Sequence, residues 1–421
     1  QEGLRPGPRG LIPGGLAPPR PRTGLEKDRE IRYPGRTKNN DTRKDSMGIQ
    51  ELISLSQKYG KDPEFVLAGG GNTSYKDGKN LWIKASGFPL ADIGEGGFAR
   101  MDEDQLADIW KKEYPADPES REEQALADLM DARSEGETKR PSVETLLHDL
   151  FPQAYVVHLH PPLVNGLTCS MGGKEAAEDL FPEGFVWIPV VNPGYVLAAE
   201  VRKAVEEYTA RGKGAPSLVF LQNHGVFVAA DTADEIDRLY NTIMNRLGEA
   251  VSRRPDLSPV TVDGKRVAEL QEYLQDLLSV PACGFEANAE IMKLLENEES
   301  FSPVSSSLTP DHIVYYGDRP LLVGNAAELD RQKGLIAEGL RSYRQGRETD
   351  PRIVAVLGFG IFAVGNTPKV VDTALVLFND AVKISVYAEA FGGVRFMPQD
   401  KIDFIVNWEV EQYRSKVNEE S

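Results

Sequence analysis

Two short segments hold three of the five histidines in this chain. His158 and His160 lie in the apolar, β-branched run 156–161, and His224 follows a second apolar run, 217–222. On a β-strand, residues i and i+2 point to the same face, so the first two imidazoles would lie side by side. A third imidazole from another strand could complete an open three-histidine metal site. The alternative, core histidines bonded to backbone carbonyls, suits a lone histidine better than this pattern.

Two glycine-containing segments could bind an anion. Residues 69–74 read Gly-Gly-Gly-Asn-Thr-Ser, and residues 85–87 read Ala-Ser-Gly after a short apolar strand. Glycine lets backbone N–H groups approach an anion closely, and asparagine and serine add side-chain donors. Neither segment has the ending of a Walker loop or the GxGxxG pattern, so each could also be a simple hairpin turn.

A helix is expected to begin near Pro141, since proline suits the first turn of a helix. This places Ser142 and Glu144 at a helix N-terminus, where the helix dipole favours an anion. Glu144 could act chemically or could simply be a favourable first-turn glutamate. His148 lies one helical turn further on and is expected to pack or to hydrogen-bond locally.

These segments together resemble the class II aldolase/adducin family, which includes fuculose- and rhamnulose-phosphate aldolases and ribulose-phosphate 4-epimerase. The resemblance covers roughly residues 48–250 and keeps the order of the family's motifs. The matching segments are Gly-Gly-Asn-Thr-Ser at 70–74, Lys-Ala-Ser-Gly at 84–87, Pro-Ser-Val-Glu at 141–144, His-Leu-His at 158–160 and Gln-Asn-His-Gly at 222–225.

The resemblance implies a role for each matching residue. Zn²⁺, or another divalent metal, would be held by His158, His160 and His224. Glu144 would be the catalytic acid/base and could also contact the metal before substrate arrives. The phosphate of the substrate would be held by Asn72, Ser86, Gly87 and Ser142. Val143 replaces the second serine of the family's Pro-Ser-Ser-Glu segment, so one phosphate donor of the family is missing.

The implied activity is a zinc-dependent, reversible retro-aldol cleavage of a ketose 1-phosphate to dihydroxyacetone phosphate and an aldehyde. A 6-deoxyhexulose 1-phosphate of the rhamnulose or fuculose type is the expected substrate. A bound metal would stabilise the enediolate charge, and Glu144 would move the proton at the enediolate carbon. The alternatives are a sugar-phosphate 4-epimerase, another metal-enolate lyase, or a non-catalytic adducin-like interaction module. A scaffold has no need of three histidines and a glutamate, which favours catalysis.

The family implies an α/β fold, a three-layer α/β/α unit with a mainly antiparallel sheet, and a homo-oligomer. Residues 1–46, rich in Pro, Gly and Arg, are predicted to be a disordered extension, with a helical pattern opening at Met47. Residues 47–300 are predicted to form the catalytic domain, and 301–421 a smaller C-terminal α/β unit after a Ser- and Pro-rich linker at 302–310. This unit resembles the middle region of bifunctional rhamnulose-phosphate aldolase/alcohol dehydrogenases. Because the chain lacks GxGxxG, dehydrogenase activity is not expected.

The C-terminal unit also contains a weak sequence repeat of part of the catalytic domain. Residues 356–367 repeat the order of residues 221–232: an apolar strand, a turn with glycine, a second apolar strand and a Thr-containing helix start. Phe359 stands where His224 stands. This predicts a degenerate repeat that has lost its metal ligand, although the same order of elements also arises by convergence.

Composition sets limits on partners and location. The formal net charge of −17 disfavours binding to nucleic acid or to an anionic membrane, because both need basic patches. A small-molecule sugar phosphate is the expected partner, since a local pocket can be positive on an acidic protein. Cys169 and Cys283 are the only cysteines, which suits a reducing compartment, and cytoplasmic location is expected.

Overall fold

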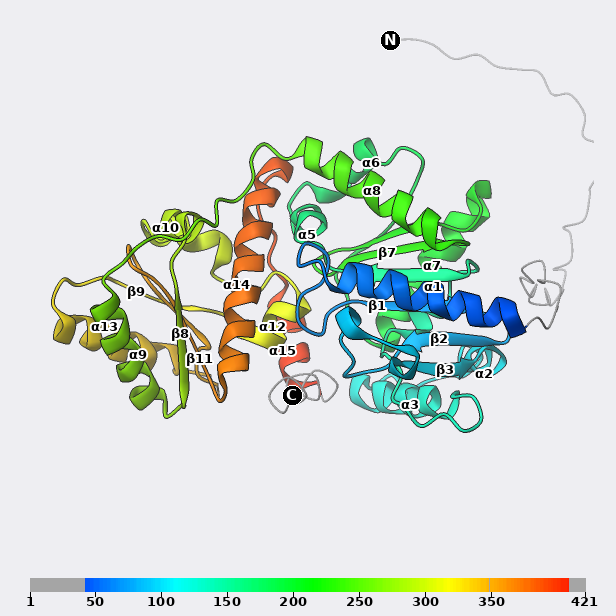
Figure 1. Ribbon diagram of the computed structural model, residues 1–421, viewed down its shortest axis with the longest axis horizontal. Coiled ribbons are helices and arrows are strands. Elements are labelled where there is room, and N and C mark those ends of the chain that lie inside the picture. Colours follow the sequence, from blue (N-terminus) through cyan, green and yellow to red (C-terminus); the bar gives the residue numbers. More distant parts are fainter. Residues whose placement is uncertain (1–41, 348, 409–421) are drawn as a thin grey trace, which may run out of the picture. The chain divides into compact units, whose positions relative to one another are not determined.

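Seven strands form the larger of two sheets in the computed structural model, which describes residues 42–347 and 349–408. All neighbouring strands pair antiparallel except β5 and β6, which are parallel. Figure 1 labels β1, β2, β3 and β7 of this sheet. The sheet order is β3-β2-β1-β4-β7-β6-β5. The strands are β1 Asn72–Lys76, β2 Asn80–Lys84, β3 Phe98–Asp102, β4 Tyr155–Leu159, β5 Val186–Ile188, β6 Leu218–Leu221 and β7 Gly225–Ala230.

Helices cover both faces of this sheet, because the side chains of its central strands alternate between two apolar clusters. Val157 packs into one cluster with α1, α5, α6 and α8, whereas its neighbour Val156 packs into the other with α2, α3, α4 and α7. The mainly antiparallel sheet is therefore the middle of three α/β/α layers, as predicted. The helices are α1 Thr42–Gly60, α2 Glu103–Ile109, α3 Pro118–Asp131, α4 Thr145–Asp149, α5 Pro162–Thr168, α6 Gly173–Leu180, α7 Tyr195–Tyr208 and α8 Ala233–Ala250.

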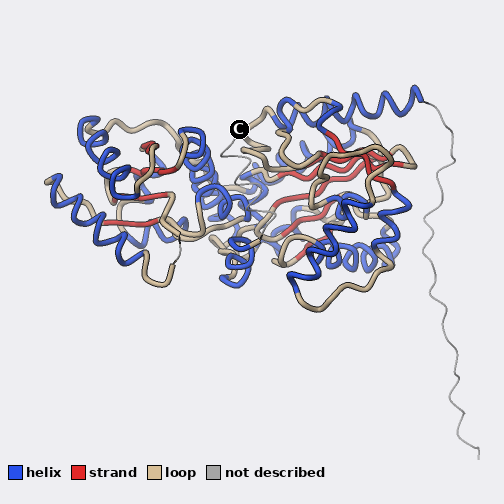
Figure 2. Tube along the Cα trace, turned by 90° about the horizontal axis from the view of Figure 1, so that it is seen from below, coloured by secondary structure: helices blue, strands red, loops and turns tan. Residues whose placement is uncertain are grey.

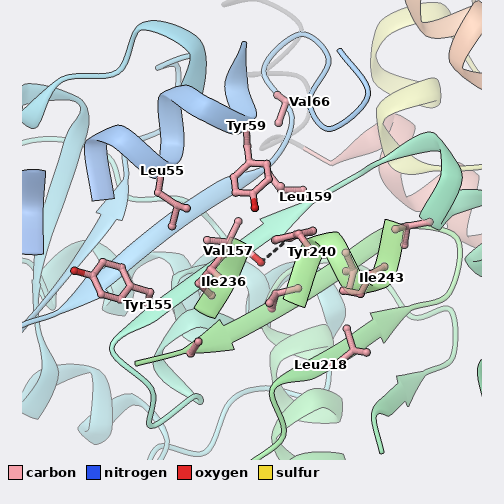
Figure 3. Packing of buried hydrophobic residues seen from close by; sticks show 14 of the residues in the cluster. Leu55, Tyr59, Val66, Tyr155, Val157, Leu159, Leu218, Ile236, Tyr240 and Ile243 are labelled. Carbon is pink, nitrogen blue, oxygen red and sulfur yellow. Dashed lines mark hydrogen bonds between the residues drawn. The ribbon is translucent and has the colours of Figure 1, made fainter. Parts of the chain in front are cut away.

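Aromatic residues connect helices α1 and α8 to the sheet through packing and a hydrogen bond. Tyr240 in α8 is fully buried and donates a hydrogen bond through its hydroxyl to the backbone oxygen of Val157, 3.1 Å away (Figure 3). Its ring lies 4.9 Å from the ring of Tyr59 in α1. This contact fixes β4, the strand that carries His158.

Helix α1 begins at Thr42, ahead of Met47, where the apolar pattern was predicted to open. The apolar face of the helix begins at Ile49, and the sequence Thr42–Ser46 contains no apolar residue that could have signalled its first turn. The remainder of the predicted disordered extension, residues 1–41, lies outside the described residues.

A second sheet of four strands has the order β8-β11-β10-β9. Figure 2 shows the strands of the two sheets as separate groups. Apolar residues of α9 and α13 pack on one face, and those of α10, α11, α12, α14 and α15 on the other. The strands are β8 Ala282–Glu286, β9 Leu321–Val323, β10 Ile353–Val356 and β11 Gly360–Gly365. The helices are α9 Gly264–Leu278, α10 Ala289–Leu294, α11 Glu298–Phe301, α12 Pro310–Tyr316, α13 Leu329–Tyr343, α14 Pro368–Ala388 and α15 Gln399–Asn407.

Two features of this second sheet bear on the predicted organisation. Strand β8 precedes residue 300 yet pairs with β11, so the sheet uses residues on both sides of the predicted domain boundary. The segment 302–310 is not an exposed linker, since Ser307 and Leu308 are fully buried. Ser307 donates its hydroxyl hydrogen to the backbone oxygen of Gly317, 2.9 Å away, which satisfies a polar side chain inside the core.

Four strands of the large sheet, in the order β4-β7-β6-β5, match the order β8-β11-β10-β9 of the second sheet, as a degenerate repeat predicts. The unit β4-α5…β5-α7-β6-β7-α8 corresponds to β8-α10…β9-α13-β10-β11-α14, including the parallel pairs β5–β6 and β9–β10. The turns before β7 and β11 both contain a left-handed residue, Asn223 at φ 56° and Gly358 at φ 63°. The helices that follow are both capped by a threonine side chain, Thr232 and Thr367.

Strand register makes the correspondence residue-specific. His158 pairs with Phe227 in the first sheet, and Phe285 pairs with Phe362 at the equivalent place in the second. By the same alignment, Phe285, Ala287 and Phe359 stand where the first unit has its three histidines.

The two sheets are joined through helices that pack closely. Helix α14 lies against α5, and a Cβ added to Gly166 in α5 would lie 2.4 Å from the Cβ of Tyr387 in α14 (Figure 1). Such a close approach of two helices requires glycine. Among the described helices, none has both the length and the apolar character needed to cross a membrane.

Candidate metal centre

The three histidines predicted from the sequence meet at one end of the large sheet. His158 is the penultimate residue of β4, His160 follows that strand, and His224 ends the turn between β6 and β7. One ring nitrogen of each lies within 4.8 Å of those of the other two. The Nε2 atoms of His158 and His160 are 2.9 Å apart. The fully buried His158 and the two partly buried rings therefore form one cluster of nitrogen ligands.

Backbone and ring contacts fix the orientation of His158. Its Nδ1–H donates to the backbone oxygen of Val226, 3.1 Å away, and its ring stacks on Phe227 with centroids 4.1 Å apart. The strand partner must come close at this point, because a Cβ on Gly225 would lie 2.6 Å from both the His160 ring and the backbone oxygen of Leu159. Glycine at this turn is thus a requirement of the histidine cluster.

A carboxylate from the second unit orients His160. Oδ2 of Asp311, in α12, lies 2.6 Å from Nδ1 of His160 and accepts its hydrogen bond. No local sequence pattern reveals this partner of His160, because it lies 151 positions away in the chain.

His224 is positioned by its neighbour Asn223. Asn223 is buried, adopts φ 56° and donates through Nδ2 to the backbone oxygens of Leu308 and Arg395, at 2.9 and 2.7 Å. Asparagine tolerates the left-handed conformation better than most residues with a side chain. The turn that carries the third histidine is therefore tied to the second unit.

Glu144 faces the histidine cluster. Its carboxylate oxygens lie 3.5 Å from Nε2 of His158 and 3.6 Å from Nε2 of His224, and one accepts a hydrogen bond from Nδ2 of Asn72 at 2.5 Å. Burial alone would raise the pKa of Glu144, but attraction to any positive charge held at His158 and His224, together with the Asn72 hydrogen bond, lowers the pKa to about 2. The carboxylate is ionised at neutral pH.

A chain of hydrogen bonds leads from β1 to Glu144. Because Nδ2 of Asn72 donates to Glu144, its Oδ1 must accept, and it contacts Nε2 of His148. The other ring nitrogen of His148 then accepts from the hydroxyl of Ser74, 2.7 Å away. Burial lowers the pKa of His148 to about 3, so the ring is neutral and can have one donor and one acceptor nitrogen. His148 is expected from the sequence to pack or to hydrogen-bond locally; it is buried against Phe227, with ring centroids 5.3 Å apart, and its side-chain hydrogen-bond partners lie on β1.

The donor set fits a bound divalent metal. The Nδ1–H groups of His158 and His160 donate to Val226 and Asp311, so both Nε2 atoms carry lone pairs and face each other at 2.9 Å. Two such acceptors repel unless a cation lies among them. Burial holds the pKa of His158 well below its usual range, which disfavours a proton as that cation. Three neutral imidazoles and an adjacent carboxylate are ordinary ligands for Zn²⁺.

Comparison with known proteins identifies the larger unit. The sequence model of the Class II Aldolase and Adducin N-terminal domain matches residues 50–244. This part of the chain, slightly less than half of its length, is similar to the class II aldolase/adducin family. The match contains all three histidines, Glu144 and the two glycine-containing loops, and ends before the second sheet.

Individual relatives are distant. A curated relative, the uncharacterized oxidoreductase YuxG of Bacillus subtilis (strain 168), is 24% identical over 412 aligned residues, which cover 87% of this chain. The alignment spans only 58% of the length of that relative. Two similar solved structures are the N-terminal class II aldolase domain of a Thermoplasma acidophilum protein and L-fuculose-1-phosphate aldolase from Thermus thermophilus. The first is 26% identical, covers 51% of this chain and 96% of its own, and has a TM-score of 0.41. The second is 16% identical, covers 47% of this chain and 92% of its own, and has a TM-score of 0.30.

Two of the predicted phosphate-binding segments lie side by side in this class II aldolase unit. The backbone N–H of Ser86 donates to the oxygen of Arg140, and that of Ser142 to the oxygen of Lys84. The serine hydroxyls are engaged within the chain: Ser86 donates to the oxygen of Pro141 at 3.2 Å, and Ser142 accepts from the N–H of Glu144 at 3.2 Å. Asn72 lies at Glu144, with both ends of its amide in the hydrogen-bond chain described above.

One cation at these loops was not singled out from the sequence. The buried amine of Lys84 donates to the backbone oxygen of Gly69, 3.1 Å away, and so links the Gly-rich loop 69–71 to the loop 84–87. Gly87 adopts φ 86°, a conformation that favours glycine. Position 84 was recognised only as the first residue of a motif, although an anion site needs positive charge.

Val143, the departure from the family segment, lies on a different surface. It lines a cavity of about 590 Å³ between α3, α7 and α15, together with Leu129, Leu146 and Phe404. An apolar side chain fits that lining, whereas a serine there would add a hydroxyl to it.

Proposed function

We propose that this chain is a divalent-metal-dependent aldehyde-lyase of the class II aldolase type. The observation that carries the proposal is the cluster of three imidazole rings, with one nitrogen of each within 4.8 Å of the others, and the Glu144 carboxylate 3.5 Å from His158 and 3.6 Å from His224. Zn²⁺ is the metal we propose, and His158, His160 and His224 would hold it. The family match of residues 50–244 supports this assignment.

A bound divalent ion would supply Lewis-acid stabilisation of the negative charge that develops on the substrate's ketone oxygen. The residues of the chain would do the rest. Glu144 would move a proton at the carbon next to that ketone, since it lies beside the histidines and is held in place by Asn72. Three neutral imidazole ligands would leave the positive charge of the ion largely uncompensated, which suits this chemistry.

The substrate we propose is a ketose 1-phosphate of the rhamnulose or fuculose type, cleaved to dihydroxyacetone phosphate and an aldehyde. The Gly-rich loop 69–71 and the loop 84–87 would receive the phosphate, with Lys84 as the positive charge. Because the hydroxyls of Ser86 and Ser142 bond within the chain, binding would require them to exchange partners. We propose a homo-oligomer as the working form, in line with the family.

The test combines metal analysis with a screen for retro-aldol cleavage. The purified full-length chain should contain about one divalent ion per chain and should release dihydroxyacetone phosphate from one member of a panel of ketose 1-phosphates. Epimerisation of a pentulose 5-phosphate without cleavage would show that the activity is that of an epimerase and not of an aldolase. A metal-free protein inert towards both substrate classes would contradict the proposal and favour a non-catalytic interaction module.

A further inference from the structure

One segment of the second unit contacts three of the chain segments that build the candidate site. Asp311 accepts a hydrogen bond from His160, and the backbone oxygen of Leu308 accepts one from Asn223, the residue before His224. The hydroxyl of Tyr315 accepts one from the N–H of Gly69, at 3.3 Å, in the Gly-rich loop. Residues 308–315 thus touch the strand end, the turn and the loop of the site.

Among these contacts, the one from Asp311 reaches a ligand side chain directly. The Asp311 side chain is 9% exposed, and its Oδ2 lies 2.6 Å from Nδ1 of His160. Gly70 in the Gly-rich loop lies close against this pair. A Cβ on Gly70 would lie 3.1 Å from Oδ2 of Asp311 and 3.5 Å from Nδ1 of His160.

We propose that Asp311 is a positioning residue for the metal ligand His160, so that the second unit controls the affinity of the first unit's metal site. This inference rests on the proposed function, because it concerns the same ion. An acceptor at Nδ1 keeps the hydrogen there and leaves the Nε2 lone pair for the metal. A carboxylate acceptor also makes the imidazole a stronger ligand, and such outer partners typically change metal affinity by about 10–100-fold.

The degenerate repeat would thus have a role in the metal site of the first unit. Phe285, Ala287 and Phe359 occupy the ligand positions of the second unit, which has no imidazole there. The unit that lost its own ligands instead supplies a carboxylate to the unit that kept them. The metal site is therefore complete only when both units are packed together.

The first experiment measures Zn²⁺ affinity of the full-length chain by competition with a chromophoric chelator. Asp311→Ala should weaken Zn²⁺ binding by about 10–100-fold, the usual effect of losing such a partner. Asp311→Asn keeps a hydrogen-bond acceptor without the charge, so its Zn²⁺ affinity should lie between those of Asp311→Ala and the unmodified chain. Asp318→Ala is the matched control, because Asp318 also lies in the second unit and pairs with Arg347 at 2.7 Å, away from the histidines. It should bind Zn²⁺ like the unmodified chain.

A second readout detects positioning without metal or turnover. Long-range ¹H–¹⁵N spectra of the metal-free chain should assign the proton of His160 to Nδ1, and Asp311→Ala should shift the population towards the Nε2–H tautomer. A merely structural role for Asp311 would lower the melting temperature without moving this equilibrium.

The outcomes separate the two proposals. If the unmodified chain binds Zn²⁺ and Asp311→Ala binds it equally tightly with the same His160 tautomer, the inference is wrong and the metal site stands. If His158→Ala binds Zn²⁺ as tightly as the unmodified chain, the three-histidine site itself is wrong, and the inference falls with it. If Asp311→Ala fails to fold, Asp311→Asn decides through the same two readouts.

Discussion

Asn72 on β1 and His158 on β4 face each other in register across the antiparallel pair. This pairing places the amide that holds Glu144 directly beside a candidate metal ligand. Glu144 comes from a different segment, at the start of α4, yet its carboxylate lies 2.5 Å from Asn72 and 3.5 Å from His158. The position of the proposed acid/base Glu144 relative to the candidate ligand His158 thus depends on strand register, which a rigid sheet maintains more precisely than a loop would.

Replacing a ligand should remove the metal. His158→Ala or His224→Ala takes one of three imidazoles from the cluster, and we expect the bound divalent ion to be lost on dialysis. Elemental analysis of the purified variants against the unmodified chain measures this, with circular dichroism to confirm folding. Equal metal content in the variants and the parent would contradict the three-histidine site.

Glu144→Gln separates catalysis from metal binding. Glutamine keeps the size of the side chain but removes the base, so turnover should fall by about 10²–10⁴-fold, the usual contribution of a positioned acid/base. The variant should retain Zn²⁺ and still bind an enediolate mimic such as a hydroxamate, since the metal provides that affinity. Steady-state kinetics and hydroxamate titration check both parts.

Two other results would assign Glu144 differently. Near-normal turnover of Glu144→Gln would reduce Glu144 to a residue at a helix start. Loss of Zn²⁺ together with activity would make it mainly a metal ligand.

The parts of the site that sequence predicts are those with a short period or a fixed motif order. The side-by-side placement of His158 and His160 follows from the two-residue repeat of a strand, and the family order adds His224. The partner of His160 could not be predicted, because Asp311 directly follows the segment 302–310, whose Ser and Pro content is typical of a linker. That segment is buried because Leu308 enters a core and Ser307 finds a backbone acceptor, and composition does not encode either contact.

His148 should matter for both stability and rate, because it connects Ser74 to Asn72. His148→Leu leaves the Asn72 oxygen buried without its donor, which should reduce the free energy of unfolding by about 1–3 kcal/mol. With Asn72 less restrained, Glu144 is held less well, so kcat should fall while Zn²⁺ content stays unchanged. Urea unfolding measures the free energy of unfolding, and elemental analysis measures the Zn²⁺ content. Unchanged stability would contradict the hydrogen-bond chain.

The same residue predicts a pH dependence of stability. The pKa of His148 is about 3 in the folded protein and 6.5 in the unfolded chain, so below pH 6.5 the unfolded state binds the extra proton. Stability from this group is fully present above pH 6.5 and is lost progressively as the pH falls towards 3. Between pH 6.5 and 5 the unfolding free energy of His148→Leu should therefore decline less steeply than that of the unmodified chain. Parallel slopes would mean that His148 titrates normally.

The second unit should bind no divalent ion of its own. In place of three imidazoles it has Phe285, Ala287 and Phe359, and the rings of Phe285 and Phe359 pack 5.4 Å apart. His312 is the only histidine after His224 in the chain, and its Nε2 lies 3.0 Å from Asp380 in a fully buried pair. The double variant His158→Ala/His224→Ala should therefore contain no tightly bound metal by elemental analysis. One ion per chain in that variant would place a second site outside the histidine cluster, and a crystal structure with anomalous data at the metal edge would locate it.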